Sequence, residues 1–340
     1  MRIEIIPSLK GYVVEWSEHG RYLLSRRNEI FECREIGGEL KRIGKIAAPG
    51  WKEMASRSRL AQRLFRFMVS NLLPLPNGEI FITFDKSVGV FSADGEYREL
   101  KGLERPCRVL RSAAALADDG NVYFGEYLDN AERGEMRIYR FTPGSDELET
   151  AYKFGKGEIR HIHGIYLDPF DRSLVCLTGD ADPECRMLRS RDGFTSVEQI
   201  GGGDESWRAV SALFTKDAIY YGTDAEYREN EIIRLDRESG ERKVLGKVSG
   251  TVFYSRKLGD NLLFGTTAED APAQKENVAA IYCVDRDDNL TEVVKFPKDR
   301  WHKALFQFGT IAFASPIEHP NSAFFSLVAT HNDGRTYRIA

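Results

Sequence analysis

Residues 162–200 read IHGIYLDPFDRSLVCLTGDADPECRMLRSRDGFTSVEQI, and this stretch decides the fold. It contains four short runs rich in β-branched, aromatic and other apolar residues, at 162–167, 174–178, 186–190 and 195–200. Polar turns separate them, with Asp168-Pro169 after the first run and Asp192-Gly193 after the third. The stretch therefore predicts four consecutive antiparallel strands.

The third of these runs, followed by a polar turn, recurs along the whole chain. Its seven copies begin at Leu24, Val90, Ile138, Leu188, Ile233, Ile281 and Leu327. After a longer first step of 66 residues, the copies follow one another at steps of 45–50 residues. A period of this length with four strands per unit is typical of a β-propeller. The sequence therefore predicts a single all-β domain over residues 1–340, a seven-bladed β-propeller of four-stranded antiparallel blades. Two β-sandwich domains are the alternative, although no Pro/Gly/Ser-rich linker interrupts the period.

The longer first step contains an insertion at 52–66 with helical spacing. Apolar residues that include Leu64 and Phe65 recur at steps of three to four, and Arg59 and Arg63 recur about half a turn away. We expect a helix docked on the propeller through Leu64 and Phe65, with Arg59 and Arg63 exposed. A lid over an acidic ligand and a weak contact with anionic lipid are the alternatives.

The closure of the ring has two possible forms. Residues 2–6 can be the inner strand of the first blade, or an outer strand that completes the last blade beside 335–339. The sequence leaves both open.

Composition excludes several functional classes. Of 340 residues, 42% are apolar, and 48 Lys and Arg face 52 Asp and Glu, a net charge of −4 that argues against nucleic-acid binding. No apolar run approaches the ~20 residues of a membrane span, and the first residues lack the apolar core of a signal peptide. The five cysteines contain no CxxC pair. We therefore expect reduced thiols and a cytoplasmic location.

Loop lengths indicate which face of the propeller carries function. The connections after the first and third strands of a blade are mostly tight turns, whereas those after the second and fourth strands are long and polar. Long polar loops cost ordering entropy and tend to carry binding and catalytic residues. We therefore expect the site on the face that holds the loops after the second and fourth strands.

On that face, the ends of successive second strands repeat an acidic residue shortly after a glycine. The four acids are Glu126, Asp180, Asp224 and Glu269. Carboxylates crowded at a channel mouth repel one another unless a ligand, a metal or arginines offset their charge. The alternative is that each carboxylate only bonds to a neighbouring loop.

Basic and imidazole side chains accompany these acids. Arg108 or Arg111, Arg160 and Arg208 each precede an inner strand, where they can hold a ligand carboxylate or pair with the acids.

His161 and His163 lie on one side of a strand by alternation. Three roles are open: ligands of a divalent metal together with His302 or Gln307 and a neighbouring acid, general base or acid, and a structural pair bonded to a carboxylate.

One segment carries a family resemblance. Ser190-Arg191-Asp192-Gly193-Phe194-Thr195 resembles the Asp box, the Ser-x-Asp-x-Gly-x-Thr-Trp turn of sialidase-like (BNR-repeat) propellers, with Val197 where that motif has Trp. Ser92-Ala93-Asp94-Gly95 is a fainter copy. The resemblance implies a glycan-active propeller. Some seven-bladed members of that class are polysaccharide lyases with histidine at the channel mouth, whereas sialidases have six blades, three substrate-binding arginines and a Tyr–Glu nucleophile pair.

These observations lead to a hypothesis of an enzyme for an acidic, uronate- or sialate-like glycan. As a polysaccharide lyase, it would use His161 or His163 to abstract the proton next to the carboxylate, with Tyr127 or Tyr221 as proton donor. As a glycosidase, it would use two of Glu126, Asp180 and Asp224 as general acid and base. The predicted catalytic residues are His161, His163, Glu126, Tyr127, Asp180 and Asp224; the predicted substrate-binding residues are Arg108, Arg160, Arg208, Tyr221, Glu269 and Trp301.

A non-enzymatic propeller that binds a protein partner or another ligand through the same face is the alternative function. Such a face should present aromatic anchors. Of the four tryptophans, only Trp207 and Trp301 lie in its loops, which favours a small ligand.

Overall fold

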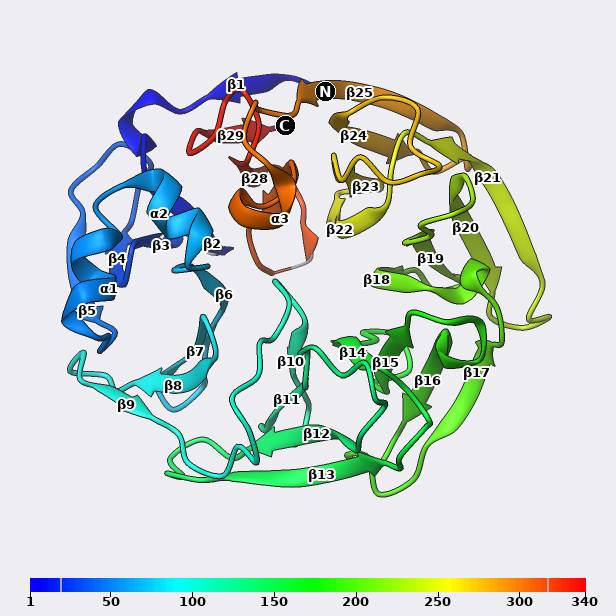
Figure 1. The fold of residues 1–340 in the computed structure, drawn as a ribbon, viewed down its shortest axis with the longest axis horizontal. Coiled ribbons are helices and arrows are strands. Elements are labelled where there is room, and N and C mark those ends of the chain that lie inside the picture. Colours follow the sequence, from blue (N-terminus) through cyan, green and yellow to red (C-terminus); the bar gives the residue numbers. More distant parts are fainter. Residues whose placement is uncertain (19, 317) are drawn as a thin grey trace.

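The computed structural model describes residues 1–18, 20–316 and 318–340, whose strands form seven antiparallel blades in a ring (Figure 1). The first three blades are β2–β5 (Val13–Glu18, Arg21–Arg26, Glu29–Cys33, Lys41–Lys45), β6–β9 (Val69–Pro74, Ile80–Phe84, Ser87–Phe91, Tyr97–Glu99) and β10–β13 (Ala114–Leu116, Val122–Gly125, Met136–Phe141, Leu148–Phe154). The next three are β14–β17 (His161–Leu167, Leu174–Gly179, Arg186–Ser190, Glu198–Gly202), β18–β21 (Ala209–Phe214, Ala218–Thr223, Asn230–Asp236, Arg242–Val248) and β22–β25 (Val252–Leu258, Asn261–Thr266, Val278–Val284, Leu290–Pro297). The seventh contains β26 (Thr310–Phe313), β28 (Ala323–Val328), β29 (Thr336–Ile339) and β1 (Ile3–Ile5). The short β27 (Glu318–His319) extends the sixth blade beside β22. The predicted seven-bladed propeller is confirmed.

The blades adhere through the apolar side chains that alternate along their strands. Between the second and third blades, for example, Phe81 packs with its ring centroid 5.7 Å from that of Phe124 and 5.8 Å from that of Phe141. Inner strands are buried on both faces, whereas the outermost strands alternate with solvent-exposed residues. This gradient follows from the ring, because each inner strand lies between two neighbouring blades.

The strand divisions predicted for residues 162–200 agree closely with β14–β17, except that the last strand begins at Glu198. The Asp192 carboxylate accepts a hydrogen bond from the backbone N–H of Ser196 at 2.9 Å, which prolongs the turn before that strand. The segment that resembles an Asp box is therefore a side-chain-stabilised turn between the third and fourth strands of its blade.

The ring closes through its first residues, in the second of the two predicted forms. β1 pairs antiparallel with β29 as the outermost strand of the last blade. The backbone N–H of Arg2 donates to the carbonyl of Ala340 at 2.7 Å, and Ala340 donates back to Arg2 at 3.0 Å. The two ends of the chain therefore lie in one blade (Figure 1).

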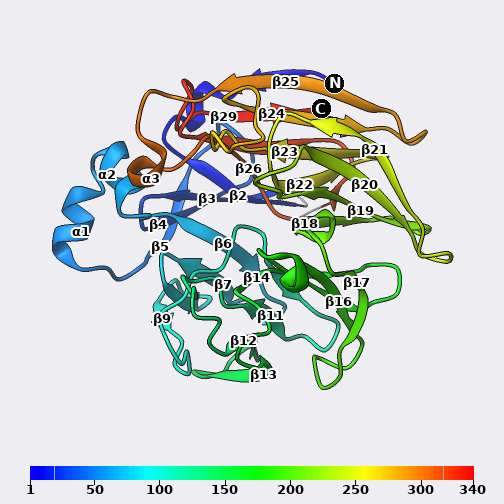
Figure 2. The same cartoon turned by 45° about the vertical axis from the view of Figure 1, so that its right-hand side comes forward.

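The insertion is helical as predicted, but Arg63 is buried and Leu64 is exposed, while Arg59 and Phe65 are both half-buried. It forms α1 (Gly50–Ala55) and α2 (Arg59–Leu64), which lie on the same side of the ring as α3 (Lys303–Phe306) (Figure 2). Arg63 is 1% exposed, and Leu64 is 39% exposed. The expectation of a buried Leu64 and an exposed Arg63 is therefore wrong. The reason is that Arg63 donates to the carbonyl of Phe306 at 2.7 Å and to the Asp299 carboxylate at 2.5 Å.

Three short 3₁₀ helices complete the structure: η1 (Pro7–Leu9), η2 (Asp182–Glu184) and η3 (Glu205–Trp207). Within the described ranges, no helix is both long and apolar enough to cross a membrane.

Candidate functional site

The inner strands share a local irregularity on the face predicted to carry function. The pairing register between first and second strands shifts near the start of β2, β6, β14, β18 and β22. Such bulges redirect side chains and often occur next to functional sites. In β14 the shift lies between Ile162 and Gly164, and both histidines of this strand point to the same carboxylate.

That carboxylate belongs to Asp180, which follows β15. His161 pairs with Gly179 across β14 and β15, so the start of one strand brings its imidazole beside the end of the other. The Nε2 atom of His161 lies 3.1 Å from both carboxylate oxygens of Asp180, and Nε2 of His163 lies 3.4 Å from Oδ1. A carboxylate within hydrogen-bond reach of the histidines was predicted, and Asp180 is that group.

The two imidazoles differ in how they are held. His163 donates its Nδ1–H to the carbonyl of Ala209 at 2.8 Å, and its side chain is 2% exposed. Nδ1 of His161 lies 3.4 Å from the carbonyl of Leu128, a loose contact, and this side chain is 8% exposed. Burial lowers the pKa of His163, which is therefore neutral near pH 7. His161 is the imidazole closer to solvent, and His163 is fixed by its surroundings.

Two arginines complete the surroundings of Asp180. Arg160 lies 3.1 Å from Oδ2, and Arg208 lies 3.1 Å from Oδ1 while its Nε donates to Asp224 at 3.1 Å. Burial by itself would raise the pKa of Asp180, but its hydrogen bonds to His161 and His163 and their charges hold that pKa well below its usual range. Arg160 and Arg208 are thus engaged with carboxylates of the protein itself.

Asp224 and Glu269 behave in the opposite way. Burial raises the pKa of Asp224, and the charge of Glu269 raises it further although Arg208 acts against both. Burial likewise raises the pKa of Glu269, whose carboxylate accepts a hydrogen bond from Thr267 at 3.2 Å. These carboxyls retain a proton to higher pH than ordinary ones, whereas Asp180 stays ionised.

Tyr127 connects this cluster to the axis of the ring. Its ring centroid lies 4.3 Å from that of His161 and 6.3 Å from that of His163. Burial raises the pKa of Tyr127, and the negative charges of Asp224 and Asp180 add to the shift. The phenol therefore stays protonated at neutral pH and is available as a hydrogen-bond or proton donor.

The other predicted catalytic and aromatic residues lie apart from the cluster. The buried Glu126 accepts hydrogen bonds from Arg105 at 3.1 Å and from Tyr139 at 3.0 Å. Tyr221 stacks on Trp207 inside the fifth blade, with centroids 6.0 Å apart. Adjacent side chains on extended backbone point to opposite sides, which is why Tyr127 faces the histidines and Glu126 does not.

The remaining predicted residues lie beside the helices. Trp301 and His302 are exposed in the segment before α3. Gln307 is buried and donates its amide to the carbonyl of Arg63 at 3.0 Å. Arg108 contacts Asp85 at 3.3 Å.

The histidines and Asp180 have the geometry of a metal site. Over the described residues, they are the single group of at least three potential ligands, with their ligand atoms all within 4.8 Å of one another, and His302 and Gln307 do not belong to it. In the tautomer with the proton on Nδ1, beside the carbonyls of Leu128 and Ala209, each Nε2 lone pair is free to bind an ion shared with Asp180. Separations of 3.1–3.4 Å match adjacent ligands of an octahedral ion at about 2.2 Å. These residues therefore fit a divalent ion.

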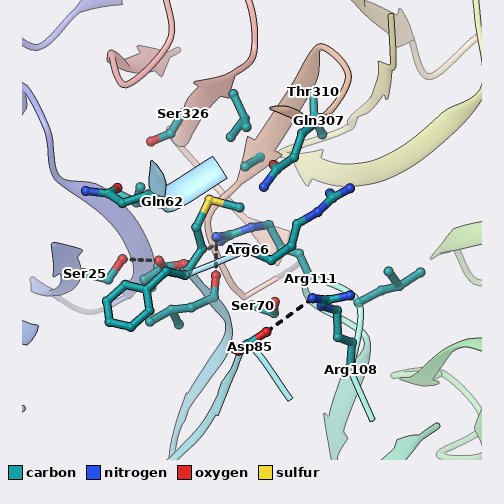
Figure 3. Close-up of a pocket in the computed structure, with 18 of the residues that line it drawn as sticks. Ser25, Gln62, Arg66, Ser70, Asp85, Arg108, Arg111, Gln307, Thr310 and Ser326 are labelled. Atoms are coloured by element: carbon teal, nitrogen blue, oxygen red, sulfur yellow. Dashed lines mark hydrogen bonds and ion pairs between the residues drawn. The ribbon is translucent and has the colours of Figure 1, made fainter. Parts of the chain in front are cut away.

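A cavity of about 270 Å³ lies next to this cluster and shares Tyr127 with it. α2 contributes Arg59 and Gln62 to its wall, and the segment after α3 contributes Gln307 (Figure 3). Sequence reasoning missed this cavity. The sequence had nevertheless singled out four of its lining residues for other sites, Arg108, Arg111, Tyr127 and Gln307, and Arg66 continues the arginine spacing of the insertion.

Fold and site together define a seven-bladed β-propeller with a histidine–carboxylate–arginine cluster at the start of the inner strand of its fourth blade. No protein-family model and no curated protein sequence matches the chain. Solved structures match it throughout. Virginiamycin B lyase from Staphylococcus aureus is 14% identical with a TM-score of 0.63, and the match covers 99% of this chain and 97% of the lyase.

An oligogalacturonate lyase in complex with manganese is 9% identical, with a TM-score of 0.58 and coverage of 96% and 93%. A chain of the nidogen/laminin complex is 14% identical, with a TM-score of 0.51 and coverage of 82% and 93%. At these identities the likeness shows the fold alone. The structural neighbours thus include lyases and a protein-binding propeller, and the resemblance to sialidase-like repeats finds no support among them.

Proposed function

We propose that this protein is a lyase that removes a proton next to the carboxylate of an acidic substrate at the channel mouth. One observation carries the proposal: an ionised Asp180 bonded to His161 lies beside carboxyls whose pKa is raised. Neighbouring groups whose pKa values are pushed apart are typical of paired acid and base roles. The lyases among proteins of the same fold support the reaction class.

The proposed base is His161. Asp180 accepts its Nε2–H and leaves Nδ1, which is only loosely engaged at 3.4 Å, to take the proton. The electron pair of the broken C–H bond forms a C=C bond, and the bond from the adjacent carbon to the leaving oxygen breaks. That oxygen takes a proton from Tyr127 or from the Asp224–Glu269 pair. His163 acts as a positioning residue, because it is buried and fixed to Ala209.

A divalent ion held by His161, His163 and Asp180 would supply Lewis acidity toward the substrate carboxylate. An ion at Nε2 would replace the hydrogen bond to Asp180 and keep the proton of His161 on Nδ1, so His161 acts either as a metal ligand or as the base described above. Arg160 and Arg208 hold Asp180 ionised from both sides.

An acidic glycan is the proposed substrate class, and the oligogalacturonate lyase of the same fold supports it. The glycosidase alternative would use the Asp224–Glu269 pair as acid and base. We also propose a cytoplasmic location, which the five unpaired, buried cysteines support.

The test is a substrate screen with oligogalacturonate, sialyl oligosaccharides and virginiamycin B, in which unsaturated products are detected by ultraviolet absorbance and mass spectrometry. His161→Gln should lower the turnover of any substrate by about 10²–10⁴-fold. His331→Gln, an exposed histidine elsewhere, is the matched control. Products of hydrolysis in place of elimination would favour the glycosidase. Full activity of His161→Gln would contradict the assigned base.

A protein-binding propeller is the second candidate, because α1 exposes Trp51 and Met54 by 57% and 66%. The nidogen/laminin complex supports such a use of the fold. Absence of turnover on the whole screen, together with a partner that Trp51→Ser releases, would favour this function.

A further inference from the structure

The cavity next to the histidine cluster has an unusual charge balance. It is lined by five arginines, Arg27, Arg59, Arg66, Arg108 and Arg111, and by two acids, Glu15 and Asp85. The Glu15 carboxylate forms an ion pair with Arg111 and accepts a hydrogen bond from Ser25. The Asp85 carboxylate forms ion pairs with both Arg108 and Lys52. Among the described residues, no carboxylate pairs with Arg66. Arg59 pairs with Asp333, which lies outside the lining, so the unpaired positive charge of the cavity is centred on Arg66.

Arg66 is held there at a cost to stability. Its backbone has φ of 55°, a left-handed conformation that long side chains rarely adopt. Burial lowers the pKa of its guanidinium, and the neighbouring charge of Arg108 lowers it further. A partly buried cation beside a like charge destabilises the fold unless an anion joins it.

A second strained residue lines the same cavity. Gln307 has φ of 66° and ψ of 162°, a region populated almost only by glycine. Its amide donates to the carbonyl of Arg63 in α2, so the segment after α3 and the insertion are joined at this wall. Strained backbone concentrated around a charged cavity is typical of a binding site.

The rest of the lining favours an organic ligand. Five aromatic side chains contribute to the wall: Phe67, Tyr127, Phe253, Tyr254 and Phe308. Side-chain hydroxyl groups of Ser70 and Thr310 add polar contacts. This combination suits a molecule with one anionic end and a flat body, since aromatic faces cover the body while a guanidinium binds two oxygens at once.

We propose that this cavity binds a small organic acid, with its carboxylate between Arg66 and Arg108 and its flat body against the aromatic side chains. Tyr127 borders both the cavity and the histidine cluster. An acid bound here would extend toward His161, and its role as the substrate-binding end of that site rests on the proposed function. Arg66, which pairs with no carboxylate among the described residues, and Arg108, which shares Asp85 with Lys52, then take the carboxylate-binding role that the sequence suggested for Arg108, Arg160 and Arg208.

Calorimetric titration at low ionic strength tests the proposal without any need for turnover. The probes are benzoate against benzamide, and galacturonate against galactose, so that each pair differs in the carboxylate. Arg66→Asn removes the guanidinium, and asparagine tolerates the positive φ. The control is Arg57→Asn, which removes an exposed arginine of the same insertion.

We expect at least one carboxylate to bind and its neutral counterpart not to bind. Arg66→Asn should weaken that binding at least tenfold while its melting temperature stays equal or rises, and Arg57→Asn should leave binding unchanged. Whether benzoate or galacturonate binds distinguishes an aromatic acid from a sugar acid. The proposal is overturned if neither carboxylate binds, if the neutral probes bind equally well, if inorganic phosphate binds more tightly than both acids, or if Arg66→Asn binds as the wild type does. Binding of a carboxylate probe by the wild-type protein, with no turnover of any substrate in the screen, would contradict the proposed function alone.

Discussion

At the scale of single residues, His163 couples the site to the stability of the fold. Its Nδ1–H is donated to Ala209, and it is almost fully buried, so its removal leaves a buried carbonyl without a partner. A loss of about 1–3 kcal/mol is expected for such a change. His163 therefore supports the fold as well as the site, and His161 is the better residue for a functional test.

The pH dependence of stability should report this burial. Burial lowers the pKa of His163 below 6.5, so between its folded pKa and 6.5 the unfolded chain binds more protons than the folded one. The contribution of His163 to stability is thus complete above pH 6.5 and declines as the pH falls below it. Asp224 and Glu269, with raised pKa values, act in the opposite sense, since their burial costs more as they ionise with rising pH.

A difference measurement separates these effects. His163→Asn should be less stable than the wild type at pH 7.5, and the gap should narrow at pH 5.5, as measured by urea unfolding at both pH values. The exposed His331→Asn serves as control and should show no such change. A gap that stays constant would mean that His163 has an ordinary pKa in the folded protein.

Gly179 is the backbone position that admits the histidine. A Cβ atom at this residue would lie 2.7 Å from Cε1 of His163 and 3.1 Å from Cγ of Arg208. Gly179→Ala should therefore displace the imidazole and cost about 1–3 kcal/mol. Gly50→Ala is the control, because a Cβ there meets no atom within 4 Å. The histidine side-chain resonances in NMR spectra should shift in the first variant and stay in the second.

At the scale of elements, the insertion is held by charge more than by apolar contact. Arg63 contacts Asp299 and the carbonyl of Phe306, and Arg59 binds both oxygens of Asp333 at 3.1 Å. Arg63→Met keeps the length of the side chain but leaves Asp299 with fewer partners in a mostly buried position. Removal of one partner of a buried ion pair costs about 3–5 kcal/mol.

We expect this loss to appear as local opening of α2. Hydrogen exchange at 59–64 should accelerate in Arg63→Met, and proteolysis should cut there. Leu64→Ala should have little effect, because its side chain is 39% exposed. If hydrogen exchange at 59–64 accelerated more in Leu64→Ala than in Arg63→Met, the helix would dock through apolar contacts, as the sequence predicted.

The two kinds of element differ in how much of them the sequence predicts. Blades repeat, so alternation and turn residues reinforce one another seven times, and the strands at 162–200 follow almost entirely from them. The buried face of a short helix is harder to predict. Choosing the face of Leu64 and Phe65 from their periodicity assumes that the docking surface is apolar. The receiving surface presents Asp299, Asp333 and a backbone carbonyl. A polar surface assembled from distant residues leaves no local signal in the insertion.

The site shows the same division. The prediction that His161 and His163 lie near a carboxylate depended on strand order, which the repeat supplies. The choice between Glu126 and Tyr127 as the residue facing the cluster depended on a register of one residue, which the pattern at that strand end does not specify. The charged cavity itself could not be predicted, because its arginines come from a turn of the first blade, the connection between the second and third blades, and the insertion, which only the folded ring brings together.

At the scale of the whole molecule, the closed ring is what places the site. Its cluster combines residues of the third, fourth and fifth blades, so any opening of the ring relaxes the distances between them. The closure rests on a strand of three residues, β1, paired to β29. The backbone N–H groups of Arg2 and Ile6 donate hydrogen bonds to the C-terminal segment that holds β29. Because such bonds recur at every second residue of an antiparallel pair, Glu4 exchanges backbone hydrogen bonds with Arg338, and the N–H of Ile5 points away from β29.

Proline substitutions at these adjacent positions test the closure. Glu4→Pro removes a backbone donor to β29 and should cost about 1–2 kcal/mol, with faster hydrogen exchange along 336–339. Ile5→Pro imposes the same ring restriction on a residue whose N–H makes no ladder bond, so it should cost less. Glu4→Ala is the control for the loss of the Glu4 side chain. Its exposed ion pair with Arg338 at 2.7 Å contributes little to stability. Equal melting temperatures for the two proline variants would mean that β1 contributes no ladder bond to the last blade. The ring would then be held by the packing of neighbouring blades alone.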